Sequence, residues 1–306
     1  MMLSDNKEPM VAIVIINWNG YEDTVECIIS LQKIEYKNYE IVLVDNGSGN
    51  DEAIKLEQKF SNIKIIRNRD NLGFSGGNNV GINYSLEQNA EFILLLNNDT
   101  IVEENFLNPL VEKFLFDKSL GIVAPQINYY SEPNRIWSAG GKISKIRGSG
   151  FAYTNKLESQ SLRIDRKVDF VSGCCMLIKR NVFQDVGLFD ERYFLYTEDT
   201  DFCFRARKAG FAIYITSASK IFHKVSNSTK ENYFSLPIYY TTRNRLYFAK
   251  KNFSQYLPIT FLYISITMLA KSIFWFMRRK ETNINAVHKA FGDYLTGKMG
   301  MTNHKF

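Results

Sequence analysis

The sequence contains little proline, cysteine or histidine. Its 306 residues include six prolines and three histidines, with no low-complexity tract and no internal repeat. The cysteines are Cys27, Cys174, Cys175 and Cys203. None belongs to a CxxC pair, and two adjacent cysteines are poorly placed to bind one zinc ion. We therefore expect buried, reduced thiols in a cytosolic protein rather than a zinc module.

The N-terminus lacks the features of a secretory signal. One apolar run, residues 10–16, follows an acidic leader, whereas a signal peptide has a basic start and a longer apolar core. We expect the body of the chain to stay in the cytoplasm. Its length and its 45% hydrophobic content suit one large domain, or one domain with a smaller appendage.

Acidic residues are scarce in the last third of the chain. Residues 1–203 contain 21 Lys and Arg against 29 Asp and Glu, a net charge of −8. Residues 204–306 contain 17 against 3, a net charge of +14. A basic tail on an acidic body indicates a polyanionic partner, which is nucleic acid, anionic lipid or a phosphorylated substrate.

Apolar runs alternate with amphipathic segments through the first half of the chain. Strands are predicted at 10–16, 40–44, 63–66, 92–96 and 122–124, and helices at 24–33, 51–60, 75–86 and 103–116. A hairpin-like excursion follows in 127–170, then helices at 179–186 and 200–209, a strand at 211–215 and only helices beyond about residue 230. This alternation predicts an α/β fold with a largely parallel, twisted sheet and helices on both faces.

Polar residues follow three of these predicted strands. Asn17 follows the first, Asp45 the second and Asp99 the fourth. In a parallel sheet, ligands bind beyond the carboxyl ends of the strands. Three polar clusters at one edge therefore favour a binding site there over ordinary loop polarity.

A dinucleotide-binding fingerprint is absent. The stretch NLGFSGGNNVG, residues 71–81, is rich in glycine and asparagine but is not GxGxxG, and no acidic residue follows at the ribose position. Its backbone could approach a phosphate, or it could be a plain turn and helix cap. The missing glycine pattern and the missing acidic residue argue against a nucleotide-binding oxidoreductase, an alternative that NADH fluorescence titration would test.

Two residues are candidate metal ligands. Asp99 offers a carboxylate oxygen to Mg²⁺ or Mn²⁺, which would keep water and phosphate oxygens in its other positions. His223 could be a second ligand, although a lone histidine is more often a surface or hydrogen-bonded residue.

Three carboxylates are concentrated in the stretch LYTEDTDFCFR. Asp199 could act as a general base, with Glu198 and Asp201 positioning it or binding substrate hydroxyls. Acidic groups in the first turn also stabilise a helix, so capping is an alternative.

The order and spacing of these motifs resemble family 2 glycosyltransferases of the GT-A fold, within the bacterial rhamnosyltransferase-like group. The matching segments are VAIVIINWNG (11–20), VDNGS (44–48), NLGFSGGNNVGI (71–82), LLLNNDT (94–100), FVSGCCMLIKR (170–180), FDERYFLYTEDTDFCFRARKAGF (189–211) and TRNRLYFAKKN (242–252), together with His223. The resemblance runs from about residue 11 to about residue 252. It implies a nucleotide-sugar donor, best dTDP-rhamnose with UDP-hexoses as alternatives, and inversion at the anomeric carbon.

The resemblance also implies roles for individual residues. Asp199 would be the base within an ED pair formed with Glu198, and Asp99 would end a DxD-like metal motif with His223 as a further ligand. Asn17 and Asp45 would contact the nucleoside, and Asn71 and Asn78 would lie along the donor pocket. The first position of the metal motif is Asn97 instead of Asp, and an amide offers an oxygen without charge.

The last third of the chain contains the longest uncharged run, residues 253–270, which is followed by Lys271, SIFWFM and an Arg-Arg-Lys triplet. Thr260, Thr267, Lys271 and Arg278 recur at helical spacing on one face. This pattern favours an amphipathic helix in the membrane interface over a spanning helix or a helix packed on the body. Lipid is a better partner than nucleic acid for so apolar a tail.

We therefore expect a GT-A-like glycosyltransferase domain at 1–228 and a basic, helical, membrane-associating region at 229–306. The enzyme would sit peripherally at the inner face of the cell membrane and act on a glycan, plausibly a lipid-linked one. A non-catalytic scaffold with the same fold is the remaining alternative, which donor hydrolysis would refute.

Overall fold

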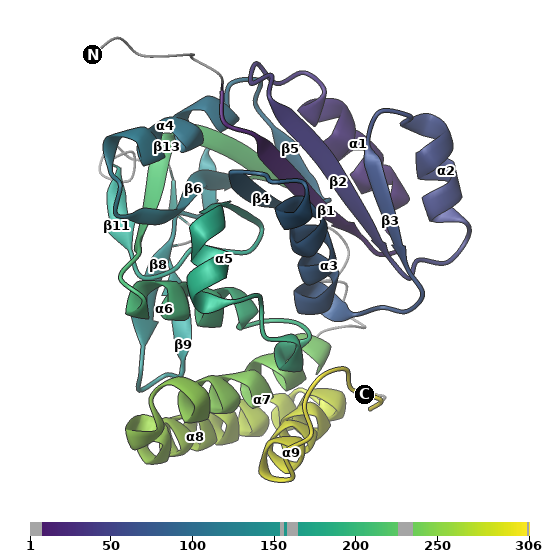
Figure 1. Ribbon diagram of the computed structural model, residues 1–306. Helices are drawn as coiled ribbons and strands as arrows, with labels where there is room; N and C mark the ends of the chain where they lie inside the picture. The colour runs from purple at the N-terminus through teal and green to yellow at the C-terminus, as the bar shows by residue number, and fades with distance from the viewer. Residues whose placement is uncertain (1–7, 154–155, 158–164, 226–234, 305) are drawn as a thin grey trace.

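A computed structural model of the protein describes residues 8–153, 156–157, 165–225, 235–304 and 306. A twisted sheet lies between helices, and a group formed by α7, α8 and α9 packs below one end of this body (Figure 1). The helices are α1 (Tyr21–Leu31), α2 (Glu52–Lys59), α3 (Gly73–Glu87), α4 (Leu107–Phe116), α5 (Arg180–Val186), α6 (Glu198–Lys208), α7 (Ser235–Asn252), α8 (Leu257–Met277) and α9 (Glu281–Leu295).

The large sheet has the strand order β10-β7-β6-β12-β4-β1-β2-β3, with β5, β11 and β13 joined to its β6 side. Its strands are β1 (Val11–Asn17), β2 (Tyr39–Asn46), β3 (Lys64–Asn68), β4 (Phe92–Asn97), β5 (Thr100–Val102), β6 (Leu120–Tyr129), β7 (Arg135–Ser138), β10 (Lys156–Leu157), β11 (Arg166–Val168), β12 (Cys175–Lys179) and β13 (Ala212–His223). The expected parallel pairing is confirmed for β4, β1, β2 and β3. Strand β12 runs antiparallel between β4 and β6, so the whole sheet is mixed.

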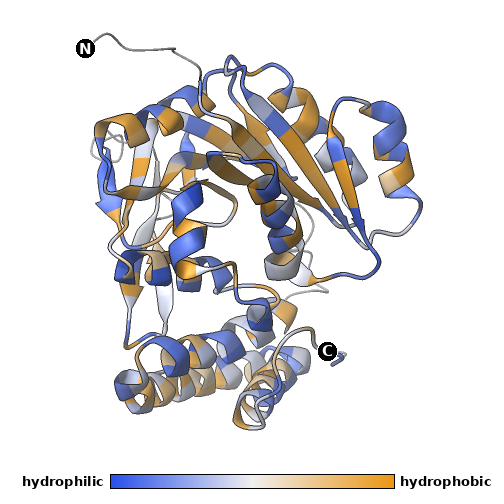
Figure 2. Ribbon diagram, in the orientation of Figure 1, coloured by the Kyte–Doolittle hydropathy of each residue, from blue (hydrophilic) through white to orange (hydrophobic). Residues whose placement is uncertain are grey.

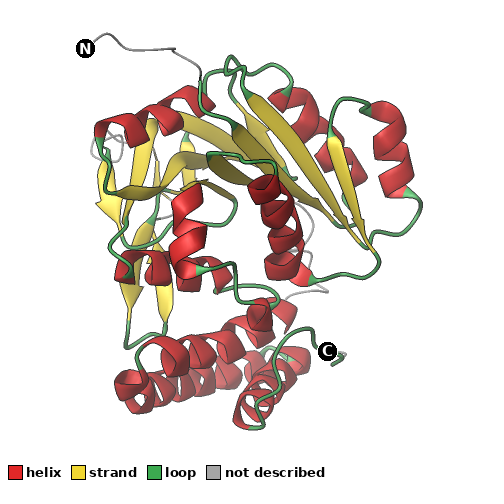
Figure 3. Ribbon diagram, viewed as in Figure 1, coloured by secondary structure: helices red, strands yellow, loops and turns green. Residues whose placement is uncertain are grey.

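Strand β1 is buried on both faces, and its alternate residues serve two separate cores. Val11, Ile13 and Ile15 pack in a cluster with residues of α1, α2 and α4. Ala12 and Val14 pack in the other cluster, with residues of α3, α5 and α6. Successive side chains of a strand point to opposite faces, so one apolar run supplies both layers. Figures 2 and 3 show the apolar residues gathered along the central strands and the helices that cover them.

Strand β13 is longer than the sequence predicts. It runs from Ala212 to His223, whereas the apolar pattern ends at residue 215 because polar residues follow. The register with β6 shifts between Thr216 and Lys220, after which the strand also pairs with β5. His223 is therefore the last residue of a strand, opposite Thr100, and not part of a following loop. The expected excursion is confirmed as a hairpin of β8 (Gly141–Ser144) and β9 (Ser149–Ala152).

Helix α8 is buried along only one side, mainly against α7 and α9. The polar stripe that the sequence predicts begins buried at Thr260, whose Oγ1 donates to the Lys145 carbonyl at 2.7 Å, and ends exposed at Arg278. Ile264 and Met268 are buried beside it. The segment Ser254–Met277 is the one candidate in the described chain that is long and apolar enough to cross a membrane, and only 17% of its most apolar window is buried.

Candidate active site

The ends of β1 and β2 bring Asn17 and Asp45 together, as the sequence predicts. The two residues are in register, and Asn17 Nδ2 donates to Asp45 Oδ1 at 3.0 Å and to Glu52 Oε2 at 2.9 Å. Both Asn17 and Asp45 are buried. The Asn17 amide thus holds two carboxylates at the carboxyl edge of the sheet.

Asn46 orders the neighbouring Gly-rich loop, a role that the sequence does not reveal. Its Nδ2 donates to Asn71 Oδ1 at 3.0 Å and to the Gly73 carbonyl at 3.1 Å, and its Oδ1 accepts from the Leu72 N–H at 3.1 Å. Asn71 therefore lies at the sheet edge beside β2. Asn78 is buried within α3, where its amide donates to the Phe74 carbonyl at 2.9 Å.

The two candidate metal ligands, 124 residues apart in sequence, meet across β5 and β13. His223 Nε2 lies 3.0 Å from Asp99 Oδ1, and both side chains are mostly buried. His223 Nδ1 is buried without a hydrogen-bond partner among the described residues. Two ligands in adjacent positions of an octahedral ion, with bonds of about 2.1 Å, lie about 3 Å apart. The pair fits a Mg²⁺ or Mn²⁺ ion that takes its remaining ligands from water and phosphate.

The described residues do not form a larger protein cage for a metal. No group of three or more His, Cys, Asp or Glu that could hold a metal occurs in the described part of the chain. Asn97, the expected first position of the motif, ends β4, and its N–H donates to the Cys174 carbonyl at 2.8 Å. The Asn98 amide turns away from the motif and donates to Thr24 Oγ1 on α1 at 2.9 Å.

Asp199 lies in the first turn of α6, next to the segment that contacts the metal motif. Its Oδ2 accepts from the Gly173 N–H at 3.1 Å, and its Oδ1 accepts from the Thr200 N–H at 2.6 Å. Gly173 precedes Cys174, which binds Asn97, so Asp199 and the metal motif bind adjacent residues of one segment. Burial raises the pKa of the Asp199 carboxyl, although these hydrogen bonds oppose the shift. A base of raised pKa is better matched to proton abstraction near neutral pH.

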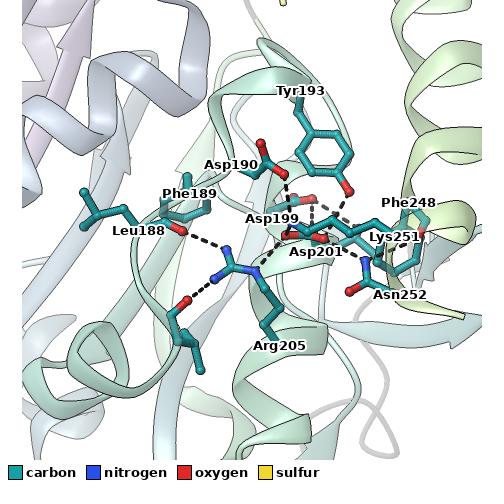
Figure 4. A network of polar contacts seen from close by, with 12 residues as sticks. Leu188, Phe189, Asp190, Tyr193, Asp199, Asp201, Arg205, Phe248, Lys251 and Asn252 are labelled. Carbon is teal, nitrogen blue, oxygen red and sulfur yellow. Dashed lines mark hydrogen bonds and ion pairs between the residues drawn. The ribbon is translucent and has the colours of Figure 1, made fainter. Parts of the chain in front are cut away.

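The other two carboxylates of the cluster have different surroundings. Glu198 is buried and its Oε2 lacks a partner within the described residues, so burial and the charge of Asp199 raise its pKa well above the ordinary value. Asp201 is fully buried and bound by four donors (Figure 4). These donors are Tyr193 Oη, Arg205 Nε, Lys251 Nζ and Asn252 Nδ2, at 2.7–3.0 Å. Asp201 is thus a structural anchor between α6 and α7, and Asp199 remains the candidate base.

The loop before α6 has an unusual backbone. Phe194, Tyr196 and Thr197 all have positive φ, at 62°, 67° and 78°. None is glycine, and such conformations cost free energy unless surrounding contacts impose them. Backbone strain of this kind accumulates at functional sites. None of the residue types in FLYT favours a positive φ, so the sequence does not predict this backbone conformation.

Comparisons with known proteins concern the family and the fold of the chain. The model of the family "Glycosyl transferase family 2" matches residues 12–187. The low-salt glycan biosynthesis hexosyltransferase Agl10 of Haloferax volcanii is 28% identical over 273 residues, which cover 86% of this chain and 85% of that protein. The N-acetylglucosaminyl-diphospho-decaprenol L-rhamnosyltransferase of Mycobacterium tuberculosis is 24% identical over 247 residues, 72% of this chain and 78% of that protein.

A solved structure shares the fold. The mannosyltransferase of Pyrobaculum calidifontis in complex with GDP-Man and Mn²⁺ aligns with a TM-score of 0.57 at 12% identity, covering 96% of this chain and 89% of that one. Likeness at this identity concerns the fold alone, and it confirms the GT-A-like architecture.

Proposed function

Because this chain belongs to glycosyl transferase family 2 and is a glycosyltransferase, we propose that it transfers a sugar with inversion and that Asp199 is its general base. The observation that carries this proposal is the different state of three neighbouring carboxylates. Asp201 accepts hydrogen bonds from four donors, and Glu198 is buried with a strongly raised pKa. Asp199 accepts hydrogen bonds that orient it, while burial raises its pKa.

In the proposed reaction the acceptor oxygen attacks the anomeric carbon from the face opposite the diphosphate. The new C–O bond forms as the bond from the anomeric carbon to the diphosphate oxygen breaks, and the acceptor proton passes to an Asp199 oxygen. A divalent ion held by Asp99 and His223 would supply positive charge against the leaving diphosphate. The main-chain N–H of Gly173, which donates to Asp199 Oδ2 at 3.1 Å, would hold one oxygen of this base in place.

We assign the donor to a nucleotide sugar, best dTDP-rhamnose, with a UDP-hexose as the alternative. The Mycobacterium relative named as a rhamnosyltransferase supports the first, and the Haloferax relative named as a hexosyltransferase supports the second. In this proposal Asn17 and Asp45 contact the nucleoside, and Asn71 lies along the donor pocket. Asn78 and Asn97 remain proposed members of the donor pocket, and Glu198 of the acceptor side.

We further propose a glycan acceptor that is linked to a lipid, and a peripheral position at the cytoplasmic face of the membrane. The relative named for a diphospho-decaprenol acceptor supports the first part. The second part rests on α8, whose outward face is apolar and whose end continues into Arg278, Arg279 and Lys280. In this proposal residues 1–228 form the glycosyltransferase domain and residues 229–306 the membrane-associating region.

The test is release of nucleoside diphosphate from a panel of dTDP- and UDP-sugars, with Mg²⁺ or Mn²⁺ and a membrane-lipid extract as acceptor. We expect one donor to turn over in the wild type and the rate to fall about 10²- to 10⁴-fold in Asp199→Asn. Unchanged turnover in this variant would assign the base elsewhere. Absence of turnover with every donor and acceptor would favour the alternative that the chain is a non-catalytic scaffold with the same fold.

A further inference from the structure

We infer that Asn244 of α7 is a positioning residue for the transfer reaction, because its side-chain amide holds the strained loop that presents Asp199. This inference rests on the proposed function. Asn244 lies 45 residues beyond Asp199 in the chain, outside the matched family segment and outside the proposed catalytic domain. It is fully buried.

One amide group binds three carbonyls of the loop. Asn244 Nδ2 lies 2.9 Å from the Tyr193 oxygen and 2.8 Å from each of the Leu195 and Tyr196 oxygens. An amide nitrogen carries two hydrogens, so at least one of them is shared between two acceptors. These contacts fold the loop around a single donor and offset the cost of its positive-φ residues.

The remaining carbonyl of the loop is bound from the opposite side. The Phe74 N–H at the start of α3 donates to the Phe194 oxygen at 2.7 Å. Gly73 has a φ of +71°, and a Cβ at this position would lie 2.4 Å from the same oxygen, so only glycine allows the approach. The loop is thus held between the Gly-rich segment of the donor side and α7.

Arg243 fixes the orientation of the amide. Its Nε donates to Asn244 Oδ1 at 3.1 Å, which turns Nδ2 toward the loop. The buried guanidinium lies over the rings of Tyr239 and Tyr240, 5.1 Å from each centroid, and its Nη1 donates to Tyr239 Oη at 3.1 Å. Arg243 also contacts the loop directly, because its Nη2 donates to the Tyr193 oxygen at 3.4 Å.

The chain allows a near-isosteric test. Asn244→Asp keeps the acceptor that Arg243 binds but replaces the donor with an oxygen that repels three carbonyls. Asn244→Ala removes the group. The matched control is Asn283→Ala on α9 in the same helical group, where the side chain of a similarly buried asparagine accepts one hydrogen bond from the described residues, that of the Ser235 hydroxyl at 3.2 Å.

We expect kcat to fall about 100-fold in both Asn244 variants, the loss that a displacement of roughly 1 Å produces, with donor KM within about threefold. Burial raises the pKa of Asp199, and a loosened loop admits water, so this pKa should fall in both variants. The acid limb of the pH–rate profile, where activity is lost as the base becomes protonated, should therefore move to lower pH. The ionisable neighbours that respond to its charge, Glu198 and Cys203, lie on the same helix and are unchanged. Asn283→Ala should leave kcat and this limb in place.

Hydrogen exchange of residues 193–201 provides a readout that does not depend on turnover. Faster exchange there in Asn244→Ala, and not in Asn283→Ala, supports the inference. Unaltered exchange in Asn244→Ala overturns the inference. A loss of kcat that equals the fraction of unfolded protein, with the acid limb of the pH–rate profile unchanged, overturns it as well. A wild type that releases no nucleoside diphosphate overturns the proposed function instead, and the exchange result still decides the role of Asn244.

Discussion

Glu198 and Asp199 are adjacent in the chain, yet their carboxyl groups have different surroundings. Asp199 receives main-chain donors that favour its charged form, whereas Glu198 Oε2 has no partner in the described part of the chain. When two close carboxyls differ in this way, the proton resides on the less supported one. Glu198 is therefore expected to be neutral at the pH where Asp199 acts as a base.

This difference predicts the behaviour of Glu198→Gln. A glutamine has the size and the neutral charge of a protonated glutamic acid, so we expect kcat at neutral pH within about threefold of the wild type. The measurement is the pH–rate profile of the variant beside Asp199→Asn. A loss from Glu198→Gln as deep as that from Asp199→Asn would mean that Glu198 is ionised and has taken the role of base.

At the scale of elements, helix α3 approaches the sheet closely because it presents glycines to it. A Cβ on Gly81 would lie 2.4 Å from Val14 Cγ1 and 3.2 Å from Val44 Cγ2. The start of this helix carries the loop that Asn46 orders and the N–H that binds Phe194. The distance between α3 and β1 therefore also sets the geometry of the donor side.

Gly81→Ala should be destabilising by about 1–3 kcal/mol, because the added methyl overpacks the contact with β1. The matched control is Gly292→Ala on α9, where the added Cβ would meet no described atom within 4 Å apart from its chain neighbours and the backbone of its own helix. There alanine should stabilise by about 0.5–1 kcal/mol through helix propensity. Urea unfolding of both variants measures the difference, and the same sign of change in both would mean that α3 can shift without cost.

The sequence predicts some elements better than others for physical reasons. Strands β1, β2 and β4 are continuous apolar runs because they are buried on both faces, so their pattern is visible. Strand β5 has three residues and its pairing with β13 is long-range, so no local pattern of the sequence shows that Asp99 lies beside His223. The contribution of Asn244 depends on the packing of α7 against the loop, which no local pattern encodes.

At the scale of the molecule, charge and exposed apolar surface coincide on one helix. The large hydrophobic residues of α8 that are at least half exposed are Ile259, Leu262, Ile266, Leu269, Ile273, Phe276 and Met277. At helical spacing they form one stripe, opposite the buried Thr260, Ile264 and Met268. The region that contains them carries the excess of basic residues, so an anionic bilayer matches this face in both polarity and charge.

This arrangement predicts that the protein binds vesicles through two separable contributions, burial of the apolar stripe and attraction of the basic residues to anionic lipid. The wild type should cosediment with phosphatidylcholine vesicles, and more strongly when they contain phosphatidylglycerol, with the added binding weakened by salt. Leu262→Ser with Ile266→Ser should abolish both. Arg279→Glu should weaken only the binding to the anionic vesicles, by about 30-fold, since each charge near such a surface contributes about 1 kcal/mol and the reversal changes the charge by two.

Phe116→Ser is the matched control, because Phe116 is 85% exposed at the end of α4 and should not affect vesicle binding. A wild type that ignores vesicles, but changes from dimer to monomer in the double variant, would make this face a contact between two copies. Retention in the membrane after alkaline extraction would instead indicate that Ser254–Met277 spans the bilayer. Peripheral binding keeps Thr260 hydrogen-bonded to Lys145 on the body, whereas a spanning helix has to break this contact to leave the body.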